Sequence, residues 1–216
     1  MTIGDAYLWS DVFPDNLVPR IIDLVWETWL TFPEPAADEL EIPITRRFKH
    51  CLKQAKDYRR LPLRIEREPA EDDPRTGEEL GRIDLKFMPA ESALEEVYFA
   101  FECKRLNAIE QGRRRTLAPE YVTQGMMRFV TNQYGGSVAQ GGMIGYVLDG
   151  RCDDAIQLIT ANIERRHADL RMRAGTTLAA SSLRPEINSI RESMHDLPES
   201  RTFRLHHLFL ACRTRG

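Results

Sequence analysis

Residues 97–106, VYFAFECKRL, constrain the fold more than any other stretch of the chain. Aromatic and small apolar residues alternate along it with the two-residue period of a β-strand. One strand face would carry Val97, Phe99, Phe101 and Cys103, and the other Tyr98, Ala100, Glu102 and Lys104. A carboxylate and an ammonium would then lie about 7 Å apart along a strand that is otherwise apolar. This pair is either an ion pair at a strand end or part of a functional site.

The remaining periodicity alternates between helix and strand. Helices are predicted over 16–30, 41–58, 119–134 and 153–170, with Phe48, Leu52 and Tyr58 of the second facing inward. Strands are predicted over 61–68, 82–88, 97–106, 141–150 and 203–212, an acidic turn or flexible hairpin tip over 69–81, and a loop-rich segment over 172–200. Along 82–88, Ile83, Leu85 and Phe87 are expected to share one face. The order predicts an α/β protein with a central mixed sheet flanked by helices.

Composition excludes several classes of protein. With 42% hydrophobic and 29% charged residues, the chain is typical of a soluble globular protein. No apolar run approaches the ~20 residues of a membrane span, and the first residues lack the pattern of a secretory signal, so a cytoplasmic protein without a membrane partner is expected. The cysteines are scattered without a CxxC pair, which disfavours a zinc site or a disulfide framework; they are Cys51, Cys103, Cys152 and Cys212.

Charge is unevenly distributed, although the net charge is only −3. Acidic residues predominate before residue 45, whereas basic residues gather in 46–60, 104–115 and 164–173. A segregated basic surface can bind phosphates even on a slightly acidic protein. Taken alone, each cluster is more typical of a solvated helix face.

Asp84 lies on the strand that precedes Glu102 by one short connection. Consecutive strands joined in this way are usually antiparallel neighbours, so Asp84, Glu102 and Lys104 are expected to meet at one end of the sheet. Two carboxylates suffice to hold Mg²⁺, which prefers oxygen ligands. A lysine beside them can orient or deprotonate a water and stabilise charge that develops on a phosphate.

The sequence RIDL followed by FECKRL resembles the PD-(D/E)XK nuclease superfamily, which has the restriction-endonuclease-like fold. The family pattern is an Asp on one strand and an acid-x-Lys on the next, matched here by Asp84, Glu102 and Lys104; Ile83 stands where the family usually has Pro. The resemblance implies a core over 38–150 (helix, three strands, helix, strand), after an N-terminal helical extension over 1–37. Residues 151–216 would complete the same domain.

The resemblance also implies an activity, the hydrolysis of phosphodiester bonds in DNA with Mg²⁺ or Mn²⁺. Asp84 and Glu102 would ligate the metal together with the backbone carbonyl of Cys103, and Lys104 would act on the nucleophile. The family commonly supplies a further Glu from the first core helix, for which Glu41 is the candidate and Glu39 its rival.

Two sets of residues near the motif have open alternatives. Asp84–Lys86 is a second acid-x-Lys, with Asp72 or Asp73 upstream, but those acids fall in a predicted turn. Phosphate contacts are expected from Arg113, Arg114 and Arg115, and from Tyr121 and Arg128 on the helix after the motif. Gly125 lies between Tyr121 and Arg128 and would permit the close approach of a strand or of a backbone phosphate. The alternative for Tyr121 and Arg128 is ordinary helix surface. The neighbouring His206 and His207 should face opposite sides of a strand, which precludes a shared metal.

No sequence-reading DNA-binding motif is recognisable. The resemblance therefore implies either cleavage with little sequence preference or a target supplied by a protein partner, as in a restriction or phage-defence complex. The protein would then be a homo-oligomer or a complex subunit. Two other readings stay open, a ribonuclease and a non-catalytic subunit that retains the nuclease fold.

Overall fold

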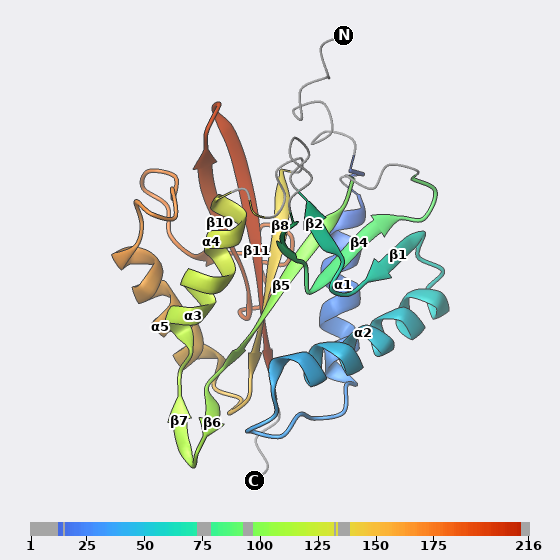
Figure 1. The fold of residues 1–216 in the computed structure, drawn as a ribbon, viewed down its shortest axis with the longest axis horizontal. Helices are drawn as coiled ribbons and strands as arrows, with labels where there is room; N and C mark the ends of the chain where they lie inside the picture. The colour runs from blue at the N-terminus through green and yellow to red at the C-terminus, as the bar shows by residue number, and fades with distance from the viewer. Residues whose placement is uncertain are drawn as a thin grey trace.

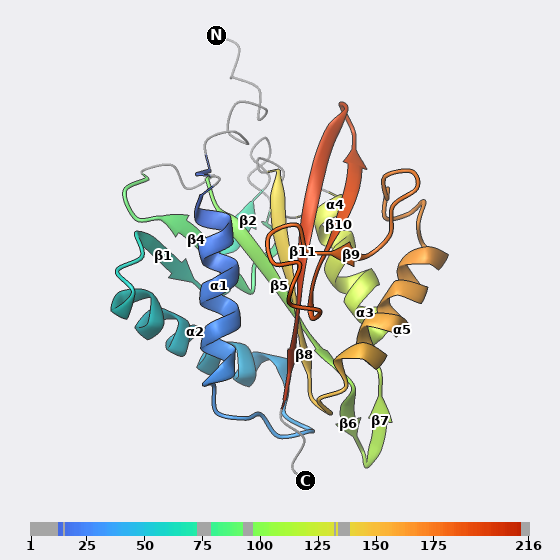
Figure 2. The ribbon, with the colours of Figure 1, turned by 180° about the vertical axis from the view of Figure 1, so that it is seen from behind.

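The protein is an α/β structure built on a seven-stranded mixed sheet, with helices on both faces (Figures 1 and 2). The computed structural model describes residues 13–14, 16–72, 79–92, 97–131, 133 and 139–212. Strand order is β1-β4-β5-β8-β11-β10-β9. The strands are β1 (Leu63–Glu66), β4 (Leu85–Pro89), β5 (Phe99–Leu106), β8 (Gln140–Val147), β9 (Ala179–Ala180), β10 (Ile190–Leu197) and β11 (Arg201–Ala211).

The connections between strands follow the predicted order. β1, β4 and β5 form an antiparallel meander, whereas β5, β8 and β11 are parallel. Parallel neighbours need a crossover. β5 reaches β8 through α3 (Ala118–Tyr121), a π-helical turn η2 (Val122–Met126) and α4 (Met127–Val130), and the chain from β8 to β11 passes through α5 (Cys152–Arg165), β9 and β10. The predicted mixed sheet with flanking helices is confirmed.

One sheet face is covered by α1 (Leu17–Leu30) and α2 (Glu41–Tyr58), as Figure 2 shows. Their apolar side chains pack with Phe99, Phe101 and Cys103 in one buried cluster. The Trp29 indole also donates a 2.8 Å hydrogen bond to the Ala211 carbonyl, which ties α1 to the last strand. The segment predicted as an N-terminal extension thus shares the core of the sheet.

The other face is covered by α3, η2, α4 and α5, which pack on Tyr98, Ala100 and Met143. A single helix over 119–134 was predicted, but the described helix contains a π-helical turn and ends at Val130. Gly125 lies in this turn, where an added Cβ would clash with the Met143 methyl group. The missing side chain therefore allows the helix to approach β8, as the sequence suggested.

Three sequence predictions about elements are wrong. Ile83 packs on the α3–α5 face while Leu85 and Phe87 pack on the α1–α2 face, because the chain bends at Asp84 between β3 (Glu79–Arg82) and β4. β3 pairs with β2 (Ala70–Asp72) in a separate two-stranded sheet. Tyr58 is 91% exposed because it occupies the last position of α2, beyond the sheet-facing stripe.

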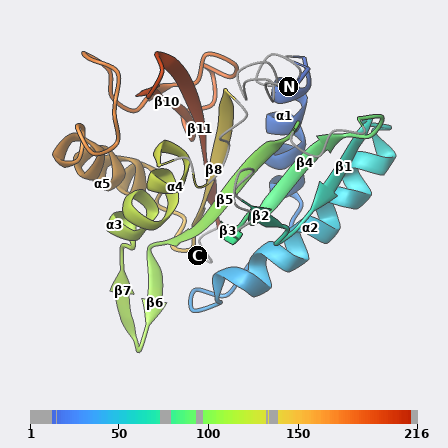
Figure 3. The same ribbon diagram turned by 45° about the horizontal axis from the view of Figure 1, so that its top comes forward.

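The third error concerns residues 172–200, which were predicted to be loop-rich but contain a strand. β10 forms within 172–200, because an antiparallel partner, β11, follows it directly. The basic segment after β5 folds into a hairpin of β6 (Ala108–Glu110) and β7 (Arg113–Arg115), which projects beyond the end of the sheet (Figure 3). No helix in the described part of the chain has the length and apolar composition needed to cross a membrane.

Gly142 is required by the packing of the central strands. It pairs with Phe101 in the parallel β5–β8 ladder, and a Cβ built on it would collide with the Phe101 ring. That ring is held edge-on by Phe87 and Phe99, so it has little room to move. Gly142→Ala is expected to destabilise the fold by about 1–3 kcal/mol, because overpacking strains a close-packed core.

Thermal melting measures this effect, with a Tm loss of about 2–4 °C per kcal/mol for a chain of this size. Adding Phe101→Leu to Gly142→Ala should recover part of the loss, since the leucine side chain leaves space at the clash. Additive losses in the double variant would contradict the proposed collision.

Candidate active site

Asp84 lies where the antiparallel ladder of β4 and β5 stops. The last pair in the ladder is Leu85 with Phe101. Beyond this pair, a side chain rather than the backbone of the neighbouring strand is the acceptor: Asp84 Oδ2 accepts a 2.7 Å hydrogen bond from the backbone N–H of Cys103. The Asp84 carboxylate is thereby fixed beside the peptide bond that follows Glu102.

Glu102 and Lys104 are on the same face of β5, as the alternation predicted. Lys104 Nζ lies 2.6 Å from Glu102 Oε1 and 2.9 Å from the carbonyl oxygen of Cys103. It also lies 3.4 Å from Glu41 Oε1. One ammonium therefore contacts two carboxylates and the carbonyl between the motif residues, and the predicted convergence of Asp84, Glu102 and Lys104 is present.

Glu41 is the first residue of α2, and its position decides between the two candidate glutamates. Besides contacting Lys104, its Oε2 accepts a 3.1 Å hydrogen bond from the backbone N–H of Arg105. Glu39 instead forms a two-pronged ion pair with Arg47, at 2.7 and 2.8 Å. Glu41, Asp84, Glu102 and Lys104 are hereafter the carboxylate–lysine cluster.

Arg128 joins this cluster from the opposite helix layer. Its Nη1 lies 2.9 Å from Glu102 Oε1, the oxygen that Lys104 also contacts. The sequence marked Arg128 only as a phosphate contact, because nothing local indicates which strand residue a helix side chain will reach. In Figure 3, β5 lies between α4, which carries Arg128, and α2, which carries Glu41.

Tyr121 does not occupy the position that the sequence suggested. It is fully buried, and its hydroxyl is 2.9 Å from His207 Nδ1. A nucleic acid cannot reach it in this fold, because its helix position faces β11 rather than solvent. The hydroxyl oxygen of Ser193 lies 2.8 Å from His207 Nε2 and 2.8 Å from His195 Nε2, so the hydrogen bonds extend from Tyr121 to His195. This buried chain of hydrogen bonds was not foreseen, since its members come from distant segments.

The predicted opposite orientation of the two adjacent histidines is confirmed. His206 contacts Gln140 Oε1 at 3.0 Å, away from the Tyr121–His207 contact. Burial lowers the pKa of His206 to about 4 and that of His207 well below its ordinary value. Both are therefore neutral core residues on different faces of β11.

The three arginines of β7 are exposed, and two of them contact carboxylates. Arg114 pairs with Asp149 at 2.8 Å, and Arg115 lies 3.5 Å from Glu110. Arg113 occupies the hairpin position opposite Glu110 in the β6–β7 register. The sequence correctly predicted that these arginines follow the motif strand, but it did not predict that Arg114 and Arg115 would contact carboxylates.

Burial dominates the electrostatics of the two central carboxylates. It raises the pKa of Asp84 to about 6, with Lys104 acting in the opposite direction. Burial and the neighbouring Asp84 raise the pKa of Glu102 to about 7. Glu102 is only 1% exposed, so even two cations do not offset the desolvation of its charge.

Lys104 shows the opposite balance. Burial acts to lower its pKa, but Glu102, Glu41 and Asp84 together raise the pKa above the ordinary lysine value. The ammonium is therefore protonated at neutral pH. Lys104 is a fixed positive charge in the free protein rather than a ready base.

The cluster fits a hard divalent cation. Glu102 Oε2 is buried and has no hydrogen-bond partner in the described structure, which is costly for a carboxylate oxygen. Asp84, Glu102 and the Cys103 carbonyl present only oxygen atoms, the donors that Mg²⁺ and Mn²⁺ prefer. Among the described residues no three His, Cys, Asp or Glu side chains form a ready cage. Mg²⁺ needs only one or two carboxylates because it keeps several waters.

The second acid-x-Lys, Asp84–Lys86, has a different environment. Lys86 is nearly buried, with its ammonium 4.2 Å from the centre of the Tyr98 ring. Asp73 and the side chain of Asp72 lie outside the described residues. Lys86 thus packs on an aromatic ring, while Lys104 contacts the carboxylates.

No protein-family model, curated protein or solved structure matches the chain. Only the geometry of the chain itself therefore bears on its function. The strongest chemical feature in that geometry is the carboxylate–lysine cluster at the end of the β4–β5 ladder.

Proposed function

We propose that this protein is a metal-dependent nuclease with a PD-(D/E)XK core, which hydrolyses phosphodiester bonds in DNA. The observation that carries the proposal is the convergence of Asp84, Glu102 and Lys104. They come from two neighbouring strands, and the Asp84 carboxylate hydrogen-bonds the backbone between the other two. A buried oxygen of Glu102 that has no donor among the described residues supports a cation there.

The topology supports the same proposal. The resemblance implies helix, three strands, helix, strand, and the chain runs α2, β1, β4, β5, α3–α4, β8. The three strands form an antiparallel meander, and β8 lies parallel to β5 after a helical crossover. Ile83 in place of the usual Pro lies at the bend before Asp84, so the Asp is positioned without it.

Asp84 and Glu102, with the Cys103 carbonyl, would hold Mg²⁺ or Mn²⁺. A bound divalent cation supplies charge neutralisation for the phosphate and lowers the pKa of a coordinated water. Asp84 is kept in place by the Cys103 N–H, so its second oxygen keeps its orientation. Such preorganisation of ligands lowers the reorganisation that binding requires.

Lys104 would stabilise negative charge on the phosphate. Its raised pKa favours this role over proton abstraction, because an ammonium cannot accept a proton. Glu41 limits the movement of Lys104 through the 3.4 Å contact, and is itself fixed by the Arg105 backbone. Arg128 would supply a second positive charge beside Glu102.

Nuclease assays test the proposal directly. Purified protein is incubated with plasmid, linear duplex, single-stranded DNA and RNA, with Mg²⁺, Mn²⁺ or EDTA. Cleavage of DNA with metal, none with EDTA, and none by Asp84→Asn are the expected results. Asp84→Asn is matched by Asp149→Asn, which removes a carboxylate that pairs with Arg114 outside the cluster.

Each other result has a defined meaning. Cleavage of RNA alone would make the protein a ribonuclease. Absence of cleavage with either metal would favour a non-catalytic subunit. Metal-independent cleavage, or full activity of Asp84→Asn, would refute the mechanism. A restriction or phage-defence role and a protein partner stay predictions.

A further inference from the structure

A row of basic side chains follows one flank of α2, starting near the carboxylate–lysine cluster. Arg46, Lys49 and Lys53 are spaced by three and four residues, which places them on the same side of the helix. Arg46 and Lys53 are exposed, and Lys49 is half-buried. These three residues are hereafter the α2 basic flank.

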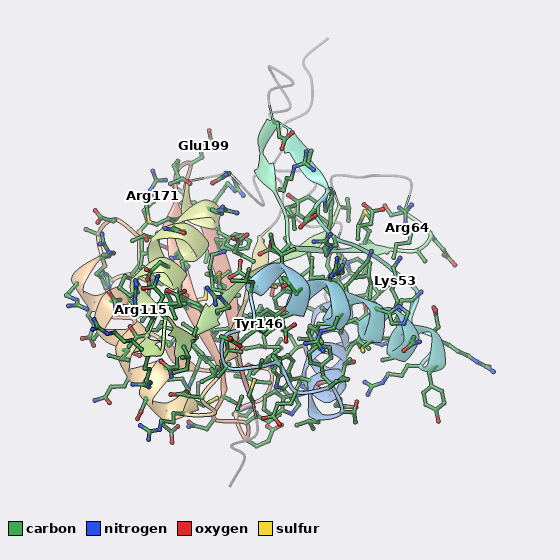
Figure 4. All side chains as sticks on the ribbon, turned by 60° about the horizontal axis from the view of Figure 1, so that its bottom comes forward. Lys53, Arg64, Arg115, Tyr146, Arg171 and Glu199 are labelled. Atoms are coloured by element: carbon green, nitrogen blue, oxygen red, sulfur yellow. The ribbon has the colours of Figure 1, made fainter. Side chains whose placement is uncertain are left out.

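Positive charge on this flank is concentrated rather than cancelled. Burial and then repulsion by Lys53 lower the pKa of Lys49, with a further contribution from Arg67; only Glu66 acts in the opposite direction. Adjacent ammonium groups repel each other at a cost in free energy, which a bound polyanion would relieve. Figure 4 shows Lys53 on α2 and Arg64 on β1 toward the same end of the molecule, well apart from Arg115.

The β7 arginines are less available for phosphates. Arg114 contacts both Asp149 and Asp154, at 2.8 and 3.6 Å. Arg115 lies 3.5 Å from Glu110 and 3.7 Å from Glu120. A phosphate would have to displace these carboxylates, whereas at the α2 basic flank it would separate like charges.

We propose that the α2 basic flank binds the sugar–phosphate backbone of a nucleic acid whose scissile bond lies at the carboxylate–lysine cluster. This inference rests on the proposed nuclease function and adds where the substrate runs. α2 begins at Glu41, which contacts Lys104. At 1.5 Å per residue, Lys53 lies about 18 Å along the helix axis from Glu41.

The length of this flank sets the extent of substrate contact. One DNA strand presents a phosphate about every 3.4 Å along the duplex axis, so 18 Å corresponds to about five nucleotides. Contacts to phosphates carry no sequence information. A duplex substrate would therefore extend at least about five nucleotides to one side of the cut and be bound with little sequence preference.

Fluorescence anisotropy in EDTA tests the surface without cleavage. A labelled 20-base-pair DNA is titrated with wild type, Lys49→Ala/Lys53→Ala and, as matched control, Arg151→Ala/Arg166→Ala, across a range of salt concentrations; each control arginine pairs with an Asp three residues further along the chain. Loss of two phosphate contacts should reduce the slope of log affinity against log salt by about 2 and weaken binding on the order of tenfold. The control should bind nearly as wild type.

Several outcomes would overturn the proposal. They are an unchanged salt slope in the Lys49→Ala/Lys53→Ala variant, an equal loss in the arginine control, and no binding by the wild type. Thermal melting checks that both variants fold. Lys49→Ala should not lower the Tm much, because it removes one of two repelling charges.

The proposed binding surface and the proposed nuclease activity can be refuted independently of each other. Duplex binding that depends on Lys49 and Lys53 without any cleavage would keep the α2 basic flank and refute the nuclease. Metal-dependent cleavage with an unchanged salt slope in the double variant would keep the nuclease and refute the flank.

Discussion

Lys104→Ala is expected to lower the rate of metal-dependent DNA cleavage by at least about 10²-fold, because it removes a preorganised positive charge from the reacting phosphate. The ammonium is held by Glu102, the Cys103 carbonyl and Glu41 at 2.6, 2.9 and 3.4 Å. Single-turnover cleavage of a labelled duplex measures the loss. Lys104→Arg should retain part of the rate if the charge matters, and none if the lysine must act as a base.

The matched control is Lys86→Ala, which changes the lysine of the other acid-x-Lys. Lys86 is nearly buried over Tyr98, so its removal should cost about 2 kcal/mol of stability through the lost cation–π contact. Its cleavage rate should stay near that of the wild type below the melting temperature. A large loss of rate in Lys86→Ala with activity retained in Lys104→Ala would assign the motif to Asp84–Lys86 instead.

Glu102→Gln is expected to abolish cleavage and to make the stability of the metal-free protein less dependent on pH. Burial holds the pKa of Glu102 at about 7, above its ordinary 4.5, so the folded state binds an extra proton between these values. Stability therefore falls as pH rises from 4.5 to 7 because the buried carboxylate must ionise. Between pH 5 and pH 8 this loss of stability amounts to roughly 2–3 kcal/mol in the wild type, and Glu102→Gln should not show it.

Urea denaturation in EDTA at pH 8 and pH 5 measures this difference. The stability of Glu102→Gln relative to the wild type should be higher at pH 8 than at pH 5. Glu39→Gln is the control, since its partly exposed pair with Arg47 should change stability by less than about 1 kcal/mol at either pH. A stability difference between Glu102→Gln and the wild type that is independent of pH would show that burial does not raise the pKa of Glu102.

Such a result would bear on function as well as on stability. A carboxylate that costs free energy in the empty fold is expected where a ligand must later be bound. Glu102 Oε2 has no donor in the described structure, although Oε1 has both Lys104 and Arg128. Added Mg²⁺ or Mn²⁺ should therefore raise the Tm of the wild type more than that of Glu102→Gln.

The sequence alone predicted the motif and five strands of the main sheet, β1, β4, β5, β8 and β11. Alternation along 97–106 correctly separates Phe99 and Phe101 from Tyr98 and Ala100, because side chains on a strand must point to opposite faces. Helical periodicity located α1, α2 and α5, since apolar stripes are set by the helix repeat. These predictions succeed because each depends on residues that are close in the chain.

Tertiary structure decided which residues surround the motif. Glu41 rather than Glu39 reaches Lys104, Arg128 reaches Glu102, and Tyr121 is buried against His207. Each contact joins segments far apart in the chain, whose approach depends on helix packing and on the bend at Asp84. Local patterns specify which way a side chain leaves its own strand or helix, but only the packed sheet and helices specify what it meets.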